Sequence, residues 1–237
     1  MTATREPRRG RPPGGAPRLT RVAIVDATLE VIDADGIDAV SMRSVAHSLG
    51  VDAKSLYNHV AGKDGLLDAV AEQILGSVRL PEPTGDVRGD LRAIGDAFRD
   101  GALAHPRAAP LVLTRRLTSL TALAPVEAVL GVLSTAGCPP RDAVPLLRGL
   151  VAALAGTLLR EVRAGPARGA ADAPGIARRQ AVLERSGLPH VAEAAADLSR
   201  FDGDAEYAYA LDLALDAVTA RLGERRATGA RRALSRE

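Results

Sequence analysis

The chain of 237 residues is poor in several residue types, and each shortage restricts what the protein can be. It contains one cysteine, Cys138, so no intrachain disulfide can form and nothing indicates an oxidising compartment. It has no tryptophan, and aromatic residues make up only 2% of the sequence. The core must therefore be built from alanine, leucine and valine, of which alanine and leucine favour helices.

Groups that would support catalysis or a metal centre are also missing. The four histidines, His47, His59, His105 and His190, do not form a cluster with metal-ligand spacing. The chain shows no phosphate-binding glycine loop, no nucleophile elbow and no Cys–His pair. We therefore expect a protein that is not an enzyme and that needs neither a cofactor nor a metal.

Long apolar runs are absent as well. The longest strongly apolar run, residues 149–159, is much shorter than the ~20 residues of a membrane-spanning helix. The N-terminus has arginines but lacks the apolar segment of a signal peptide. We expect a soluble, cytoplasmic protein that does not enter a membrane.

Apolar residues recur at helical spacing, and no convincing period-two alternation predicts a strand. The expected fold class is all-α, and 237 residues could form one large domain or a small domain plus a larger one. The net charge is only +2, yet the first 25 residues hold six arginines and one acidic residue. The two lysines, Lys54 and Lys63, both lie within one short segment.

That segment, residues 41–63 (SMRSVAHSLGVDAKSLYNHVAGK), is the most informative part of the chain. It predicts two short helices joined by a tight turn, where Gly50 can adopt the left-handed conformation that ends a helix. Asp52 can then cap the second helix, residues 53–59. A short helix with outward polar groups fits the major groove of DNA. The segment is therefore interpreted as a DNA-binding helix-turn-helix.

Two amphipathic helices are expected to flank this motif. The first spans residues 19–34, with Thr20 as its N-cap and Gly36 at its end. The other spans residues 64–78. Together they predict a DNA-binding domain over residues 19–80.

With its flanking helices, this segment resembles the TetR family of transcriptional repressors. The spelling LYNHVAGKDGLLDAV is especially similar to the tetracycline-repressor branch. The resemblance covers roughly residues 19–80 and is weaker beyond them. It implies a homodimeric repressor that binds palindromic double-stranded DNA and is released from it by a small-molecule effector. The alternative is a constitutive DNA-binding protein without an effector.

The resemblance also implies roles for single residues. Tyr57 and Lys63 match positions that contact phosphate. Alternatively, Tyr57 could pack on the first helix, and Lys63 could simply be solvated. Arg43 matches a base-reading arginine, although a phosphate contact or an intramolecular ion pair is also open. The Ser41 hydroxyl could contact DNA or cap the second helix. The remaining expected DNA contacts are Met42, Ala53, Lys54, Ser55, Asn58 and His59.

Both ends of the chain are expected to be disordered. Residues 1–18 form a Pro/Gly/Arg-rich arm without an apolar face. Arg9 and Arg11 lie in a sequence that resembles the core of an AT-hook, so they could enter the minor groove. Non-specific phosphate contact is the alternative. Residues 224–237 are expected to be a solvated tail.

Residues 85–223 are expected to form an effector-binding and dimerisation domain. In the family, the helices that match residues 142–164 and 204–222 pair with their twofold mates in a four-helix bundle. Gly149 and Gly156 would let such helices approach closely, although a monomer with these helices in its core is the alternative. Further helices are expected at 86–104, 108–120, 125–136, 176–186 and 190–199.

The resemblance implies an effector pocket within this domain. The metal-binding histidine positions of the tetracycline repressor fall near Val78 and Val112, which cannot bind metal. We therefore expect a largely apolar effector whose binding needs no divalent metal. The expected pocket residues are Leu91, Ile94, Phe98, Leu111, Leu117, Leu146, Leu150 and Leu154, with His105 and Arg115 as polar contacts.

Overall fold

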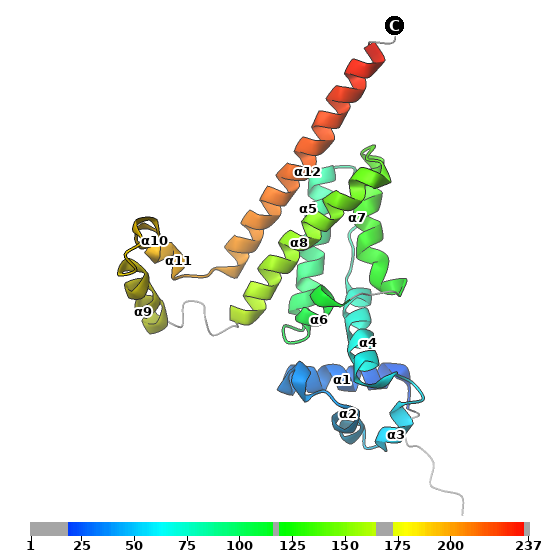
Figure 1. Ribbon diagram of the computed structural model, residues 1–237. Helices are drawn as coiled ribbons and strands as arrows, with labels where there is room; N and C mark the ends of the chain where they lie inside the picture. The colour runs from blue at the N-terminus through cyan, green and yellow to red at the C-terminus, as the bar shows by residue number, and fades with distance from the viewer. Residues whose placement is uncertain (1–18, 116–118, 165–172, 235–237) are drawn as a thin grey trace, which may run out of the picture.

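The computed structural model describes residues 19–115, 119–164 and 173–234, and every regular element in those ranges is a helix (Figure 1). This confirms the all-α prediction. The elements are α1 (Arg21–Asp35), η1 (Ile37–Ala39), α2 (Met42–Ser48), α3 (Ala53–Leu56), α4 (Gly62–Ser77), α5 (Val87–Leu103), α6 (Ala109–Thr114), η2 (Thr121–Leu123), α7 (Ala124–Thr135), α8 (Pro140–Ala164), α9 (Ala173–Glu184), α10 (Pro189–Glu193), α11 (Ala195–Leu198) and α12 (Gly203–Leu234).

The first four helices surround a core of their own. The predicted N-cap of α1 is present, because the Ala23 N–H donates to the Thr20 hydroxyl (3.1 Å). Gly36 ends this helix with a φ of 90°, which favours glycine. α1 packs against α4, and Ile24 of α1 and Leu66 of α4 are fully buried at 0% exposure. The expected helices 19–34 and 64–78 are confirmed to within a few residues.

The C-terminal domain is built on α5, α7, α8 and α12, which share a second core. α8 and α12 run side by side, and α9, α10 and α11 lie to one side of them (Figure 1). A short helix, α6, lies at the junction of the two domains, where Leu111 and Val112 join the core of the N-terminal domain. The two domains are therefore in contact through buried side chains of α6.

Several helix boundaries differ from the sequence prediction. α3 ends at Leu56, and residues 57–59 continue as a turn in which the His59 N–H donates to the Leu56 carbonyl three residues earlier (2.9 Å). α6 ends at Thr114, well before the predicted end at residue 120. The helix expected at 190–199 is divided into α10 and α11 at Ala194.

The expectation of a disordered tail from residue 224 is wrong for most of that segment. α12 continues to Leu234, past the predicted end at Leu222. Alanine and arginine, which dominate this extension, favour helices. Arg225 also forms an ion pair with Asp142 of α8, which fixes the extension to its neighbour.

The apolar part of α8 is longer than the run at residues 149–159 that the sequence shows. Among the described residues, it is the one helix long and apolar enough to cross a membrane, and 17% of its most apolar window is buried. Helices of soluble proteins that pack against other helices satisfy the same criterion.

Candidate nucleic-acid interface and interior cavity

The start of α2 is held by two serines. The Ser44 N–H donates to the Ser41 hydroxyl (3.0 Å), and the Ser41 N–H donates to the Ser44 hydroxyl (2.8 Å). The Ser41 hydroxyl thus serves as the helix cap that the sequence left as an alternative. The prediction that Met42 contacts DNA is wrong, because its apolar side chain is 8% exposed and packs in the domain core.

α3 is held in place by a cap and a buried side chain, and most of its other side chains are polar. Asp52 accepts a hydrogen bond from the Lys54 N–H (2.7 Å), and Leu56 is fully buried beneath the helix. Tyr57 is 61% exposed, so it does not pack against α1. Of the other expected contacts, Arg43, Lys54 and Asn58 are exposed, whereas Ala53, Ser55 and His59 are half-buried.

Lys63 lies in the first turn of α4 and is exposed. Its Nζ donates to the Asp38 carbonyl (3.4 Å), and the N-cap residue Ala61 makes no side-chain hydrogen bond to the helix start. The first amides of a helix and its partial positive charge attract anions. Arg43 forms no ion pair within the described residues. Lys63 and Arg43 are therefore exposed cationic groups of the N-terminal domain. Arg9 and Arg11 lie outside the described residues.

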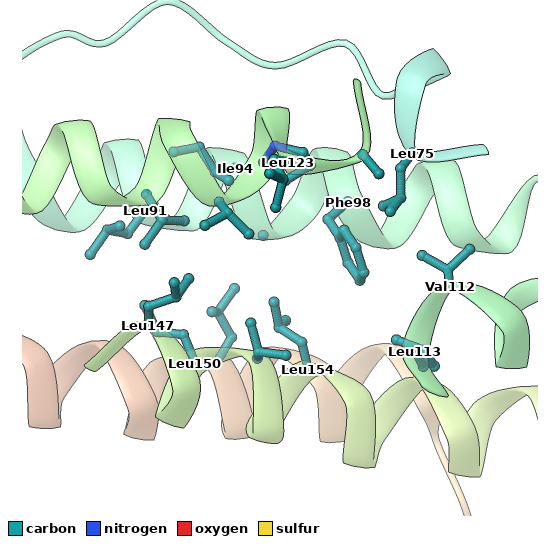
Figure 2. A pocket seen from close by; sticks show the side chains of 17 residues that line it. Leu75, Leu91, Ile94, Phe98, Val112, Leu113, Leu123, Leu147, Leu150 and Leu154 are labelled. Carbon is teal, nitrogen blue, oxygen red and sulfur yellow. The ribbon is translucent and has the colours of Figure 1, made fainter. Parts of the chain in front are cut away.

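A cavity of about 250 Å³ lies between α4, α5, α6, η2, α7, α8 and α12 (Figure 2). We refer to it as the effector cavity, because the sequence predicts an effector pocket in this domain. Leu91, Ile94 and Phe98 of α5 face Leu150 and Leu154 of α8 across it. All 17 residues that line the cavity are apolar or glycine. No lining side chain can therefore form a hydrogen bond or an ion pair with a ligand.

The structure places five of the predicted pocket residues at this cavity: Leu91, Ile94, Phe98, Leu150 and Leu154. Sequence reasoning missed Leu147 and Val151, although their helical spacing from Leu150 and Leu154 marks the same face of α8. It also missed cavity residues from other elements, which include Leu75 of α4, Val112 and Leu113 of α6, Val126 and Val129 of α7, and Leu211 of α12.

The other predicted pocket residues lie elsewhere. Leu111 packs into the core of the N-terminal domain, and Leu146 packs against the C-terminal core without lining the cavity. His105 and Arg115 do not line the cavity either, because acidic groups of the N-terminal domain bind them. Leu117 lies outside the described residues.

His105 and Arg115 instead fasten the two ends of α6 to the N-terminal domain. Nδ1 of His105 lies 2.8 Å from a carboxylate oxygen of Asp33 in the last turn of α1. At the other end, Arg115 donates to the carboxylate of Asp64 (2.9 Å) and to Asp68, both on α4. These bonds raise the pKa of Arg115. We call these contacts the α6 tethers.

A polar network joins α5, α8 and α12 below the cavity. Arg99 donates to Glu161 (2.6 Å) and to Asp204 (2.6 Å), and its guanidinium lies 4.5 Å from the ring centre of Tyr207. Burial alone would lower the pKa of Arg99, but these two carboxylates raise it. The Tyr207 hydroxyl donates to Asp96 (2.8 Å), and burial together with Asp96 raises the tyrosine pKa. Arg99 and Tyr207 thus remain protonated and hold the three helices together.

No group of three or more His, Cys, Asp and Glu side chains in the described ranges is arranged to hold a metal ion. The chemistry available in the described residues is therefore a polar, partly cationic surface on the helix-turn-helix and an apolar cavity at the domain junction. This combination defines a helix-turn-helix regulator of transcription whose second domain is helical.

The chain belongs to the TetR family. Residues 24–70 match the family model "Bacterial regulatory proteins, tetR family", and residues 80–222 match "Tetracyclin repressor-like, C-terminal domain". The chain is a DNA-binding transcriptional regulator, as the helix-turn-helix indicates, and such regulators are not enzymes.

Individual relatives support the same assignment. An HTH-type transcriptional regulator of Saccharopolyspora erythraea is 43% identical over 122 residues, which is 51% of this chain and about half (52%) of the relative. The HTH-type transcriptional repressor DrrR1 of Streptomyces coeruleorubidus is 29% identical over 92% of this chain and 83% of its own length. The class D tetracycline repressor of Escherichia coli is 37% identical over 37% of this chain and 45% of its own length.

Solved structures show the same fold. The structure of the TetR family protein ActR of Streptomyces coelicolor in complex with actinorhodin superposes with a TM-score of 0.77 and 25% identity. The superposition covers 88% of this chain and 99% of ActR.

Proposed function

We propose that this protein is a ligand-responsive repressor, a homodimer that binds a palindromic operator and is released when a small apolar effector fills the effector cavity. The entirely apolar lining of that cavity is the observation that carries the proposal. An unfilled apolar cavity of about 250 Å³ costs a protein on the order of several kcal/mol in lost packing. Binding an apolar molecule there offsets this cost.

The cavity is in direct contact with the DNA-binding domain. Leu75 of α4 and Val112 of α6 line the cavity and also belong to the core of the N-terminal domain. A ligand that needs more room would displace α4 or α6 and thereby change the position of α3. It acts as an effector only to the extent that it binds the DNA-incompetent arrangement more tightly.

Dimerisation would proceed through α8 and α12. Tyr209 and Leu213 of α12 are 69% and 54% exposed. Methyl groups added at Gly149 and Gly156 of α8 would meet nothing within 4 Å. α8 therefore leaves room around these two glycines, and α12 offers exposed apolar side chains, where a second copy would approach. A twofold dimer presents two copies of α3 to the two halves of a palindrome.

On the DNA, we propose that Tyr57 and Lys63 contact phosphate and that Arg43 reads a base, with Lys54, Ser55, Asn58 and His59 at the same surface. Ala53, half-buried in α3, would supply a methyl contact. The arm at residues 1–18 would add contacts through Arg9 and Arg11. Because its partner is DNA, we propose that the protein acts in the cytoplasm without binding a membrane.

Mass spectrometry of the native protein purified from its own host tests the ligand proposal. We expect an uncharged or largely apolar molecule to be retained, and a Phe98→Ala variant to retain less of it. Phe98 packs against the core of the N-terminal domain but belongs to neither α2 nor α3, so the variant should keep its affinity for DNA. Retention of the same molecule by both proteins would contradict our assignment of the cavity. If the protein retains no ligand, and none of the ligands tested releases it from DNA, the result would favour the constitutive alternative.

A further inference from the structure

α5 contains three glycines, Gly89, Gly95 and Gly101, although glycine is unfavourable within a helix. Glycine loses more backbone freedom on folding than alanine does, and it adds no side chain to the packing. An alanine at any of these positions would therefore favour the helix, unless a neighbouring group occupied the space of its methyl group. The surroundings of each glycine show whether such a group is present.

Neighbouring groups account for two of the three glycines. A Cβ atom added at Gly101 would lie 2.8 Å from a methyl carbon of Val78, which is too close for two carbon atoms. One added at Gly89 would lie 2.5 Å from a carboxylate oxygen of Asp86, the residue that caps α5 by accepting a hydrogen bond from the Arg88 N–H (3.2 Å). Both positions need glycine, because a side chain would displace a packed or a capping residue.

Gly95 has no such neighbour. A Cβ atom added there would lie 3.4 Å from the hydroxyl oxygen of Tyr207 and 3.5 Å from both Cδ atoms of Leu211, which are ordinary contact distances. Gly95 is buried, so the methyl group of an alanine would be packed against these side chains. Alanine would fit this position and would favour the helix, so the packing of the chain itself does not account for the glycine.

Gly95 lies in the wall of the effector cavity. Ile94 and Phe98 of the same helix line the cavity with it (Figure 2), and Leu211 is the one residue of α12 in the lining. A methyl group in contact with both Cδ atoms of Leu211 would cover part of this wall. The glycine therefore leaves open a space at the cavity wall between α5 and α12.

We propose that Gly95 determines the size of effector that the protein accepts, because it admits a part of the ligand that contacts the α5 backbone and Leu211. This inference rests on the proposed function. An apolar cavity of roughly 150 Å³ holds a benzene molecule. A cavity of about 250 Å³ suits a larger molecule, which uses the space at Gly95, whereas a small molecule leaves that space empty. A larger effector thereby also contacts α12, a helix of the proposed dimer interface.

Two neutral fluorescent probes of different size test the inference on the full-length protein, which contains no tryptophan to interfere with their emission. Naphthalene is the small probe, and N-phenyl-1-naphthylamine adds a phenylamino group to the same ring system. We expect the native protein to bind the larger probe more tightly. Gly95→Ala should weaken binding of the larger probe by on the order of five- to a hundredfold, as for overpacking of a filled site, and change the affinity for naphthalene by less than about twofold.

The melting temperature distinguishes this effect from damage to the fold. Gly95→Ala should raise it by about 2–4 °C, because alanine favours the helix and its methyl group fits. Gly131→Ala on α7 is the matched control, since a Cβ atom there would meet nothing within 4 Å and Gly131 lines a separate cavity. The control variant should gain similar stability and keep both affinities. Leu211→Val, added to the Gly95→Ala protein, should restore part of the affinity for the larger probe, because it shortens the side chain beside the new methyl group.

Equal losses of affinity for the two probes in Gly95→Ala, or no loss for the larger one, would overturn the inference. A fall in the melting temperature of this variant would overturn it as well, because the glycine would then be needed for packing. If the native protein binds naphthalene but not the larger probe, the effector cavity stands and only the role of Gly95 is contradicted. If the native protein binds neither probe, the effector cavity and the proposed function are contradicted together.

Discussion

Arg43, Tyr57 and Lys63 of the N-terminal domain offer DNA different chemistry. An arginine can form two hydrogen bonds to a guanine edge, whereas a tyrosine hydroxyl and an ammonium group suit phosphate. All three side chains are exposed, and their positions are fixed by buried neighbours such as Leu56. Specificity and general affinity should therefore be separable by single substitutions.

Lys63→Ala and Tyr57→Phe should weaken binding to all DNA sequences alike, because each removes a phosphate contact. Lys63→Ala should also reduce the salt slope by about one, because it removes a positive charge, whereas Tyr57→Phe should leave the slope unchanged. Arg43→Ala should instead cost ~1–3 kcal/mol at one base position of each half-site. Fluorescence anisotropy with operator and random DNA at several salt concentrations separates the two effects. Equal losses of Arg43→Ala on both DNAs would contradict its role in base reading.

Which residues a side chain contacts was predicted less well from its chemical type than from its position in a helix. His105 and Arg115 have the polar groups of ligand contacts, yet their partners are Asp33, Asp64 and Asp68 of the other domain. Those carboxylates are far away in sequence, so no local pattern could reveal the pairing. For Met42, the residue type alone likewise did not reveal whether its side chain faces DNA or the domain core.

At the scale of elements, α6 is the short helix whose two ends are tethered to α1 and α4. It also contributes Val112 and Leu113 to the effector cavity. A ligand that moves α6 would therefore pull on Asp64 and Asp68, which follow Lys63 on α4. Exposed ion pairs of this kind contribute only ~0–1 kcal/mol to stability, but they restrict geometry.

Arg115→Ala should accordingly leave the melting temperature almost unchanged and reduce the effect of a bound effector on DNA affinity, because α6 loses its connection to α4. Arg160→Ala is the matched control, since it breaks an ion pair between α8 and α12 and touches neither α4 nor α6. The measurement is the ratio of operator affinities with and without effector. An unchanged ratio in Arg115→Ala, or the same change in both variants, would refute this function of the tether.

Helix starts were predicted from the sequence more accurately than helix ends. Thr20 and Asp52 cap the helices that follow them, because a capping hydrogen bond is local and visible in the sequence. α12 continues past Leu222 through a segment rich in alanine and arginine, where Arg225 pairs with Asp142 on another helix. The predicted end at Leu222 missed this contact, since tertiary pairing has no local signature.

At the scale of the whole molecule, the cavities were the least predictable features. A cavity is a place where side chains fail to fill space, and the sequence shows which residues are apolar but not which gaps remain. Leu91, Ile94 and Phe98 were identified from one helix, whereas Leu75 and Leu211 come from elements at other positions along the chain. The class of fold followed from helical periodicity alone.

The proposed dimer can be tested at the open face of α8. Gly156→Leu adds bulk where the single chain has nothing within 4 Å, so the fold of each chain should persist. In a close-packed bundle the same side chain should cost ~1–3 kcal/mol, which shifts the dimer toward monomer at micromolar concentration. Gly131→Leu, on α7 outside the bundle, controls for the loss of glycine. Light scattering that gives a monomer for the native chain would remove the bundle, and with it the palindromic operator.

The most direct test of ligand-controlled DNA binding is a titration of the operator complex with the molecule retained by the native protein, in the presence of EDTA and followed by fluorescence anisotropy. We predict that DNA is released at concentrations that saturate the effector cavity and that EDTA does not alter the midpoint, because the cavity offers no metal ligand. DNA that stays bound when the cavity is saturated, or that is released only when a divalent metal is added, would contradict the proposed mechanism.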